Sequence, residues 1–425
     1  MSARSAFVAG HRPSCNLLLS FASATSCSSA AFVHAQHAFV LAQRVFVLRQ
    51  QPSWRLRRPS CSYVALKIME QLFILLRAGI WERPLEDLSG FPLSDEEWYA
   101  LYQEARRQTV MGWVYQGVTM LPEDLLPPDA LMMKWVAEVE SLALRNSKMN
   151  RAISELFTLF CDRAILPVLL KGQGLAALYP QPELRECGDI DLYFPLKTSR
   201  KKAEGILHDL GVAMEKKADG STCYQWRGME VEHHSHLTDI CNPFMKGELE
   251  KLECQWGTKG LHDCEELITV PNATGNLLLL QSHILKHSLS WGVGLRQLCD
   301  MAMAYKHLHD KADHNLLDRL NRKAGTTKWV KLLNSFLVQY LDVPTEWLRQ
   351  SEWVDATPLL DRIMRGGNFG LHRGDAERDS LSAFKRKLQT ARAFAQNIPY
   401  AWKYARKEAC WTVWALCVGM VIGER

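Results

Sequence analysis

Two aspartates one residue apart, Asp189 and Asp191, are the residues that most directly suggest chemistry in this chain of 425 residues. They stand in Gly188-Asp189-Ile190-Asp191-Leu192, and because side chains alternate along a strand, both carboxylates would share one face. Hard cations such as Mg²⁺ take oxygen ligands, commonly one or two carboxylates together with substrate phosphates. The pattern therefore indicates a divalent-metal site, although Asp-x-Asp by itself also occurs by chance at a solvated strand edge.

A lysine and a glycine-containing turn precede the two aspartates. The apolar run at 167–170 predicts a buried strand, which leads directly into Lys171 and Gly172. A short helix follows until a Pro-x-Pro sequence ends it, and the chain then passes through Arg185 to Gly188. The predicted order is strand, Lys-Gly turn, short helix, proline break and acidic strand.

The segment KGQGLAALYPQPELRECGDIDL resembles the core signature of the nucleotidyltransferase superfamily to which DNA polymerase β belongs. More narrowly, the chain resembles the bacterial uncharacterised nucleotidyltransferase family. The resemblance implies an α+β fold, a nucleotidyltransferase-fold mixed sheet flanked by helices, with an N-terminal helical block and a C-terminal helical domain. It also implies that the acids hold metal, while a turn at a helix N-terminus meets the nucleotide phosphates. The nucleotide-binding residues expected on this basis are Lys171, Gly172, Arg185, Gly188 and Arg296.

Superfamily members normally add a third carboxylate from a later strand. Residues 222–234 predict a hairpin, and by the two-residue period of its second strand Glu230, Glu232 and His234 share one face. Glu232 is expected to be the third catalytic and metal-binding acid, because Val-Glu-x-His matches the acid and histidine of the family's strand. His233 departs from that pattern, and Glu230 remains an alternative for the role.

The histidines near this strand also permit a zinc interpretation. His233, His234 and His236 stand close together, with cysteines nearby in the sequence. Zinc sites are persuasive when paired ligands recur at tight spacing, and no second pair completes a set here. We therefore expect His234 to orient Glu232 or to touch substrate, and the other two to be exposed strand residues.

A later segment contains two pairs of residues, each four positions apart. His283 and His287 would share one face of a helix, and Arg296 and Asp300, within Gly-Leu-Arg-x-x-x-Asp, would face one another on the next. In the related family such a histidine helix follows the catalytic strands. Asp300 is expected to pair with Arg296 and orient it toward a triphosphate. The alternative is a surface ion pair that contributes under about 1 kcal/mol.

The charged residues are distributed unevenly. The formal net charge is +5, but every charged residue before Glu70 is basic, so the rest of the chain is slightly negative. That remainder offers no basic face that would suggest binding to duplex DNA. The acid-free segment 1–68 resembles a mitochondrial transit peptide in composition, whereas Met69 resembles a natural start. We interpret 1–68 as a disordered or mis-started extension and the protein as cytoplasmic; an organellar location is the alternative.

The remaining chain is predicted to be mainly helical around the catalytic strands. A capping box at Ser94 and Glu97 begins a helix that continues to Val110, and longer helices are expected from 130 to 164 and from 380 to 397. The apolar stretch 409–422 is shorter than the roughly 20 residues that a membrane-spanning helix needs, so no stable membrane insertion is expected. The expected parts are 1–68, a helical region 69–165, a catalytic core 166–270 and a helical domain 271–425.

These patterns predict a metal-dependent nucleotidyltransferase. It would move an NMP group from an NTP such as ATP to an acceptor hydroxyl and release pyrophosphate, with Mg²⁺ or Mn²⁺ as cofactor. The acceptor is a small molecule, a protein or tRNA. One alternative is a catalytically inactive relative that only binds nucleotide. Another is a metal-dependent glycosyltransferase, which also uses Asp-x-Asp but should show a longer run of strands and helices before it.

Overall fold

The computed structural model divides the chain into two compact units, Met1–Ser60 and Cys61–Arg425. It describes residues 63–85, 87–217, 220–253, 255–262, 264, 267–289, 292–367 and 397–422, which all belong to the second unit. The interpretation of 1–68 as an extension therefore lies, except for its end, outside the described residues. Nearly all of the helix predicted at 380–397 lies outside them as well.

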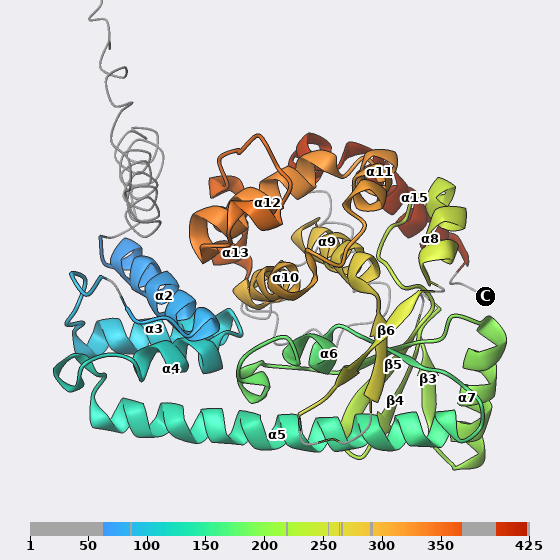
Figure 1. The fold of residues 1–425 in the computed structure, drawn as a ribbon, viewed down its shortest axis with the longest axis horizontal. Coiled ribbons are helices and arrows are strands. Elements are labelled where there is room, and N and C mark those ends of the chain that lie inside the picture. Colours follow the sequence, from blue (N-terminus) through green and yellow to red (C-terminus); the bar gives the residue numbers. More distant parts are fainter. Residues whose placement is uncertain are drawn as a thin grey trace, which may run out of the picture. The chain divides into compact units, whose positions relative to one another are not determined.

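The second unit is an α+β structure, as predicted (Figure 1). Its strands are β1 Val168–Leu170, β2 Ile190–Tyr193, β3 Met214–Lys216, β4 Thr222–Trp226, β5 Met229–His234, β6 Trp256–Gly260 and β7 Leu267–Pro271. Its helices are α2 Tyr63–Trp81, α3 Asp95–Arg107, α4 Met111–Val118, α5 Asp129–Cys161, α6 Gly172–Ala176, α7 Lys197–Asp209, α8 Lys246–Glu253, α9 Ala273–Leu289, α10 Leu295–Leu308, α11 His314–Ala324, α12 Thr327–Leu341, α13 Thr357–Gly366 and α15 Arg406–Ile422.

A mixed five-stranded sheet forms the centre, in the order β1-β2-β5-β4-β3. The pair β2 and β5 is parallel and the other neighbours are antiparallel. The predicted hairpin is confirmed as β4 and β5, with Trp226 opposite Met229 beside the turn. A separate hairpin of β6 and β7 lies against β1. The parallel pair matters most, because it carries the acidic residues on neighbouring strands.

The two faces of this sheet have different partners. Ile190, Leu192 and Val231 pack in one core cluster with apolar residues of the second half of α5. Figure 1 shows α5 running along this side of the sheet. Because side chains alternate, the intervening residues of β2 and β5 point to the other face, toward α9. There Leu279 of α9 packs with Leu170 of β1.

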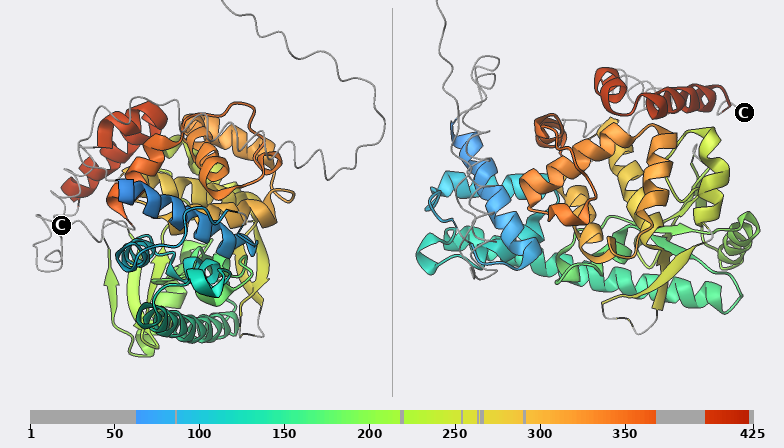
Figure 2. Two further views of the ribbon diagram at one scale, coloured as in Figure 1. Left: turned by 90° about the vertical axis from the view of Figure 1, so that its left-hand side faces the viewer. Right: turned by 45° about the horizontal axis from the view of Figure 1, so that its top comes forward.

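The helix α5 connects the sheet to the N-terminal helices. Its first half buries Trp135 and Val139 in the larger core, while its second half buries Phe157 and Phe160 in the core of the sheet. The predicted long helix is thereby confirmed, beginning at Asp129. Figure 2 shows the C-terminal helices on the side of the molecule opposite α5. The sheet thus lies between α5 and the later helices.

The N-terminal helices follow the sequence closely but differ at two boundaries. The side chain of Ser94 accepts a hydrogen bond from the backbone N–H of Glu97, and the Glu97 carboxylate accepts one from that of Ser94, which confirms the capping box. The helix α3 ends at Arg107, and Val110 instead precedes α4. The helix α2 begins at Tyr63, ahead of the expected start at Met69.

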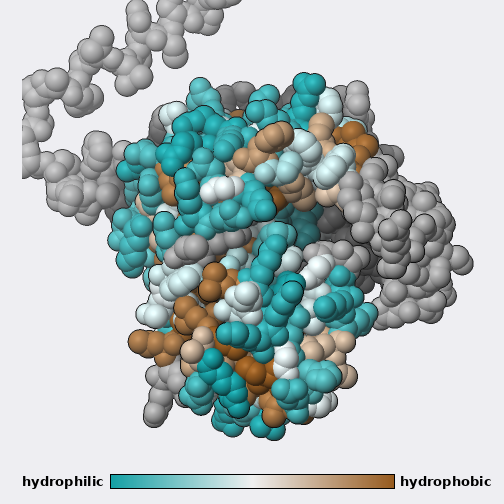
Figure 3. All heavy atoms as spheres, turned by 90° about the vertical axis from the view of Figure 1, so that its right-hand side faces the viewer, coloured by the Kyte–Doolittle hydropathy of each residue, from teal (hydrophilic) through white to brown (hydrophobic). Residues whose placement is uncertain are grey.

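The surface on one side is mainly hydrophilic. Figure 3 shows the face with the sheet edge and α7, where hydrophilic side chains predominate and hydrophobic ones form small groups. Across the described residues, none of the helices combines the length and the apolar character that crossing a bilayer requires.

Candidate active site

The predicted acids meet at the parallel strand pair. In the register of β2 and β5, Asp191 lies beside Glu232, and His234 lies on the same face two residues further along. Asp189 immediately precedes β2. Asp191 is 5 % exposed and Glu232 is 9 % exposed, so both carboxylates are drawn into the protein. The register therefore places Asp191 beside Glu232, with Asp189 just before the same strand.

Asp191 is bound by two cationic or polar partners. Lys171 Nζ lies 3.3 Å from its Oδ2, and His234 Nε2 donates a hydrogen bond of 2.5 Å to its Oδ1. Burial alone would raise the pKa of Asp191, but the charges of Lys171 and His234 outweigh it and hold that pKa well below its usual value. Asp191 is therefore ionised, and His234 contacts this acid more closely than it does Glu232, from which it lies 3.8 Å.

The pKa of Asp189 is shifted upward, in the opposite direction to that of Asp191. The negative charge of Asp191, followed by burial, raises the pKa of Asp189 to about 6, against an opposing effect of Lys171. Two carboxylates so close repel one another, and a bound cation would relieve that repulsion.

Glu232 is held by residues of the neighbouring strand and loop. Lys217 Nζ donates a hydrogen bond of 2.6 Å to its Oε2, and Cys223 Sγ lies 3.7 Å from the same oxygen. Burial raises the pKa of Glu232. The hydrogen bond from Lys217 and the charge of His234 lower that pKa by more than burial raises it, so the net shift is downward. Glu230 is exposed and lies 3.9 Å from Lys217. The register places Glu232, rather than Glu230, beside Asp191.

The Lys-Gly turn places the side chain of Lys171 next to Asp191. Lys171 directly follows β1 and has φ +48°, and Gly172 has φ +42° at the start of α6. A Cβ added at Gly172 would stand 3.2 Å from Sγ of Cys187, so a glycine suits this position on both counts. Burial lowers the pKa of Lys171, but the charges of Asp191, Asp239 and Asp189 outweigh it and raise that pKa.

Asp239 belongs to this cluster, although no pattern in the sequence predicted it. It accepts hydrogen bonds from His283 Nδ1 at 2.8 Å and Lys286 Nζ at 2.7 Å. It lies in a loop after β5, where neither spacing nor periodicity distinguishes one acid from another. The ring of His287 meets that of His283 edge to face at 4.3 Å, so the predicted shared face of these two histidines is confirmed.

His233 is a correction to the expectation of exposed strand histidines. Its side chain is fully buried on the opposite face, where the Tyr224 hydroxyl is hydrogen-bonded to its Nε2 at 2.9 Å. Burial lowers the pKa of His233 to about 3, so the ring is neutral. His236 is exposed, as expected. The strand thus directs His233 into the α5 core and His234 toward the acids.

The predicted pairing of Asp300 with Arg296 is also corrected. Asp300 instead accepts two hydrogen bonds from Arg185, at 2.8 and 2.7 Å, and a third from the Tyr179 hydroxyl at 2.9 Å. The Arg185 guanidinium is buried and turned toward Asp300, which places it within the protein rather than at a phosphate-accessible surface. Arg296 donates to the Glu186 carbonyl oxygen at 2.8 Å. A helical spacing alone did not reveal that Arg185 would approach from another segment.

These acids are the side chains that could hold the divalent cation that the fold implies. In the described part of the chain, no three His, Cys, Asp or Glu side chains are grouped closely enough to hold a metal ion by themselves. Mg²⁺ needs fewer protein ligands, because it commonly rests on one or two carboxylates and takes substrate phosphates and water besides. The mutual repulsion seen in the raised pKa of Asp189 fits such a cation at Asp189 and Asp191. Glu232 faces the same space but is occupied by Lys217.

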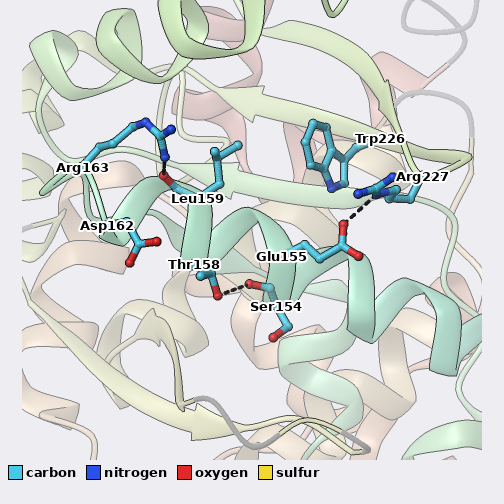
Figure 4. A pocket seen from close by; sticks show the side chains of 8 residues that line it. All are labelled: Ser154, Glu155, Thr158, Leu159, Asp162, Arg163, Trp226 and Arg227. Atoms are coloured by element: carbon cyan, nitrogen blue, oxygen red, sulfur yellow. Dashed lines mark hydrogen bonds and ion pairs between the residues drawn. The ribbon is translucent and has the colours of Figure 1, made fainter. Parts of the chain in front are cut away.

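A separate hollow lies on the other side of the sheet. It measures about 400 Å³ and lies between the end of α5 and the turn that joins β4 and β5 (Figure 4). Trp226 and Arg227 line it from the turn, and Arg227 donates a hydrogen bond of 2.7 Å to Glu155. Trp226 lies on the same face of β4 as Tyr224, which packs toward α5, so this hollow opens away from the acids.

The comparisons with known proteins agree with this geometry. Neither the curated proteins nor the solved structures contain a match to the chain. Residues 94–342, more than half of the chain, match the family described as uncharacterised nucleotidyltransferase. The match includes β1, β2, β5, α9 and α10, and so every predicted site residue. The chain therefore belongs to the uncharacterised nucleotidyltransferase family.

Proposed function

We propose that the chain transfers an NMP group from an NTP to an acceptor hydroxyl, with release of pyrophosphate and with Mg²⁺ or Mn²⁺ as cofactor. Membership of the family supports nucleotidyl transfer in general. The observation that carries the finer proposal is the arrangement of Asp189 and Asp191 at the start of β2, with Glu232 level on β5 and Lys171 against Asp191.

The carboxylates divide into two roles in this proposal. Asp189 and Asp191 hold the divalent cation, and Glu232 supplies a third carboxylate from the neighbouring strand. When bound, the cation neutralises phosphate charge and stabilises the charge that develops during transfer. The protein contributes positioning, because the parallel register fixes the separation of the strands that carry the acids.

The nucleotide phosphates are assigned to the cationic and glycine side of the site. Lys171 Nζ already lies 3.3 Å from Asp191, so it reaches the space where a metal-bound triphosphate would lie. Gly188 is exposed, and no described atom lies within 4 Å of the position of an added Cβ, so a ligand can approach its backbone closely. Arg296, beside Glu186, remains a candidate contact for the phosphates. Arg185 is instead paired with Asp300 inside the protein.

The double substitution of Asp189 and Asp191 by Asn tests this function. The protein is incubated with Mg²⁺ or Mn²⁺, NTPs labelled at the α-phosphate and a cell extract, and the labelled acceptor is identified. We expect the double variant to lose NMP transfer by at least about 10²-fold, because the cation and the charges it neutralises are lost. Asp209→Asn, at an exposed aspartate in α7, is the matched control. Full activity in the double variant would refute the assignment.

A non-catalytic relative is the second candidate, because one observation favours it. The carboxylate oxygens of Asp191 and Glu232 are already bound by Lys171, His234 and Lys217. These side chains balance the negative charge of the carboxylates without a metal. Such a protein would bind nucleotide and release no pyrophosphate. Metal-stimulated release of pyrophosphate by the wild-type protein therefore separates the two candidates.

A further inference from the structure

His283 lies on the side of α9 that packs against the acid-bearing face of the sheet. Leu279 packs with Leu170 and Tyr193 on the acid-bearing face of the sheet, and His283 follows Leu279 by one helical turn on the same side of α9. His283 interacts electrostatically with Asp191, and the charge of Lys171 is one cause of the lowered pKa of His283. His283 therefore belongs to the same electrostatic cluster as the acids, although it comes from a different element.

Asp239 determines which nitrogen of His283 carries a proton. Burial would raise the pKa of Asp239, but the hydrogen bond from His283 and the charge of Lys286 hold that pKa well below its usual value. An ionised carboxylate can only accept hydrogen bonds, so the Nδ1 that lies 2.8 Å away must be the protonated nitrogen. In a neutral ring, Nε2 then carries the lone pair.

The lone pair on Nε2 is available to a ligand. Among the described residues, none forms a hydrogen bond with Nε2 of His283, although its ring is mostly buried with a side-chain exposure of 13 %. Burial, followed by the charge of Lys171, lowers the pKa of His283 to about 4, so the ring is neutral at pH 7. A neutral imidazole with a proton-accepting Nε2 cannot donate to a phosphate through that nitrogen. It is suited to a hydroxyl.

We propose that Asp239 and His283 form a dyad in which Nε2 of His283 accepts the proton of the acceptor hydroxyl, a role that rests on the proposed function. The hydroxyl oxygen forms a bond to the α-phosphorus, and its proton moves to Nε2. The bond from the α-phosphorus to the bridging oxygen breaks, and its electron pair leaves with pyrophosphate. The imidazolium that results is stabilised by Asp239 and returns its proton to solvent.

The two members of the dyad have different roles. His283 touches the substrate hydroxyl and is the catalytic residue, while Asp239 is a positioning residue that fixes the ring and its tautomer. Lys286 Nζ donates a hydrogen bond of 2.7 Å to the second carboxylate oxygen of Asp239. The charges around the ring are those of Asp239, Lys171, Lys286 and Asp191. A bound triphosphate adds negative charge that favours protonation of Nε2.

His283→Ala is the first test, with kinetics measured on the acceptor found for the wild-type protein. We expect kcat to fall by about 10²- to 10⁴-fold while KM for the NTP changes by less than about threefold, because proton transfer and not nucleotide binding is lost. Added imidazole should restore part of kcat in this variant. Asp239→Asn should lower kcat less and gain nothing from imidazole. His309→Ala, at a histidine bonded to the Tyr305 carbonyl oxygen and stacked on Trp347, is the control.

The tautomer gives a readout that does not depend on activity. Nitrogen NMR of histidine-labelled protein should show His283 with its proton on Nδ1 in the wild type and a mixture in Asp239→Asn. A proton on Nε2 in the wild type overturns the dyad. So does a His283→Ala variant that keeps kcat within about twofold, in a protein whose transfer is abolished by the Asp189/Asp191 double substitution. A wild-type protein that transfers no nucleotide overturns the proposed function and the dyad together.

Discussion

At the scale of single residues, the site is defined by charges that lie close together. Asp191 is stabilised in its ionised form by Lys171 and His234, whereas the same Asp191 raises the pKa of Asp189 to about 6. An unfolded aspartate has a pKa of about 3.9. Because the folded value is higher, Asp189 contributes stability below about pH 4 and that contribution is lost as the pH rises through 6. At neutral pH its ionised carboxylate therefore destabilises the fold.

Asp189→Asn should accordingly stabilise the protein at pH 7.5. The expected gain in the free energy of unfolding is roughly 1–3 kcal/mol, because the neutral amide removes the repulsion from Asp191. Urea denaturation at pH 7.5 and pH 4 checks this, and the gain should disappear at pH 4, where the wild-type carboxyl is protonated. Asp209→Asn should show no gain at either pH. A variant that is less stable than wild type at pH 7.5 would contradict the assigned repulsion.

At the scale of elements, two helices hold the segment that delivers Asp189. From α5, Asn146 Nδ2 donates to the carbonyl oxygens of Glu183 and Arg185 at 2.7 and 2.8 Å. From α10, Asp300 holds the Arg185 side chain with two hydrogen bonds. Arg145 of α5 and Arg296 of α10 add hydrogen bonds to backbone carbonyl oxygens of residues 186–188. The buried ion pair is thus part of how the acids are positioned.

Asp300→Ala should be strongly destabilising. It leaves the buried Arg185 guanidinium without its carboxylate, which costs about 3–5 kcal/mol in the free energy of unfolding by urea denaturation. Asp361→Ala removes the partner of Arg365 in an exposed pair of α13 and should cost under about 1 kcal/mol. The double change Arg185→Met with Asp300→Leu should recover most of the loss, because no charge is left buried. A single Asp300→Ala cost no larger than that of the control would show that the pair is unimportant.

At the scale of the whole molecule, the acids depend on regions far apart in the chain. The second unit, Cys61–Arg425, contains α2 at one end and α15 at the other. Lys67 of α2 donates a hydrogen bond of 2.8 Å to Glu97 of α3, so the helix includes contacts from residues before Met69. On α15, Glu408 accepts a hydrogen bond from the backbone N–H of Cys241, in the loop that also carries Asp239.

Truncation at two positions should therefore give different results. A chain that starts at Cys61 should unfold at the same temperature as the full chain, because it keeps the whole second unit. A chain that starts at Met69 loses residues 63–68 at the start of α2 and the Lys67–Glu97 pair, which should cost roughly 1–2 kcal/mol. Thermal unfolding followed by circular dichroism measures both. Equal stability of the two shorter chains would show that residues 61–68 contribute nothing to the fold.

The local elements and the residue types of the site could be predicted from the order of residues alone. The alternation in 229–234 predicted β5, the capping box predicted α3, and the Asp-x-Asp pair with Lys171 before it predicted the acidic cluster. These signals are local, because each depends on spacing of a few residues along one strand or helix. The resemblance to the nucleotidyltransferase family rested on the same short segments.

The assembled fold selects which distant residues meet. It paired Asp300 with Arg185 instead of Arg296, buried His233, and brought Asp239 to His283 from a loop that has no pattern. Helical spacing states which side chains share a face, but burial and hydrogen bonding select the partner from all elements that pack nearby. That selection is a property of the assembled core, in which α9 and α10 close over the acid-bearing face of the sheet.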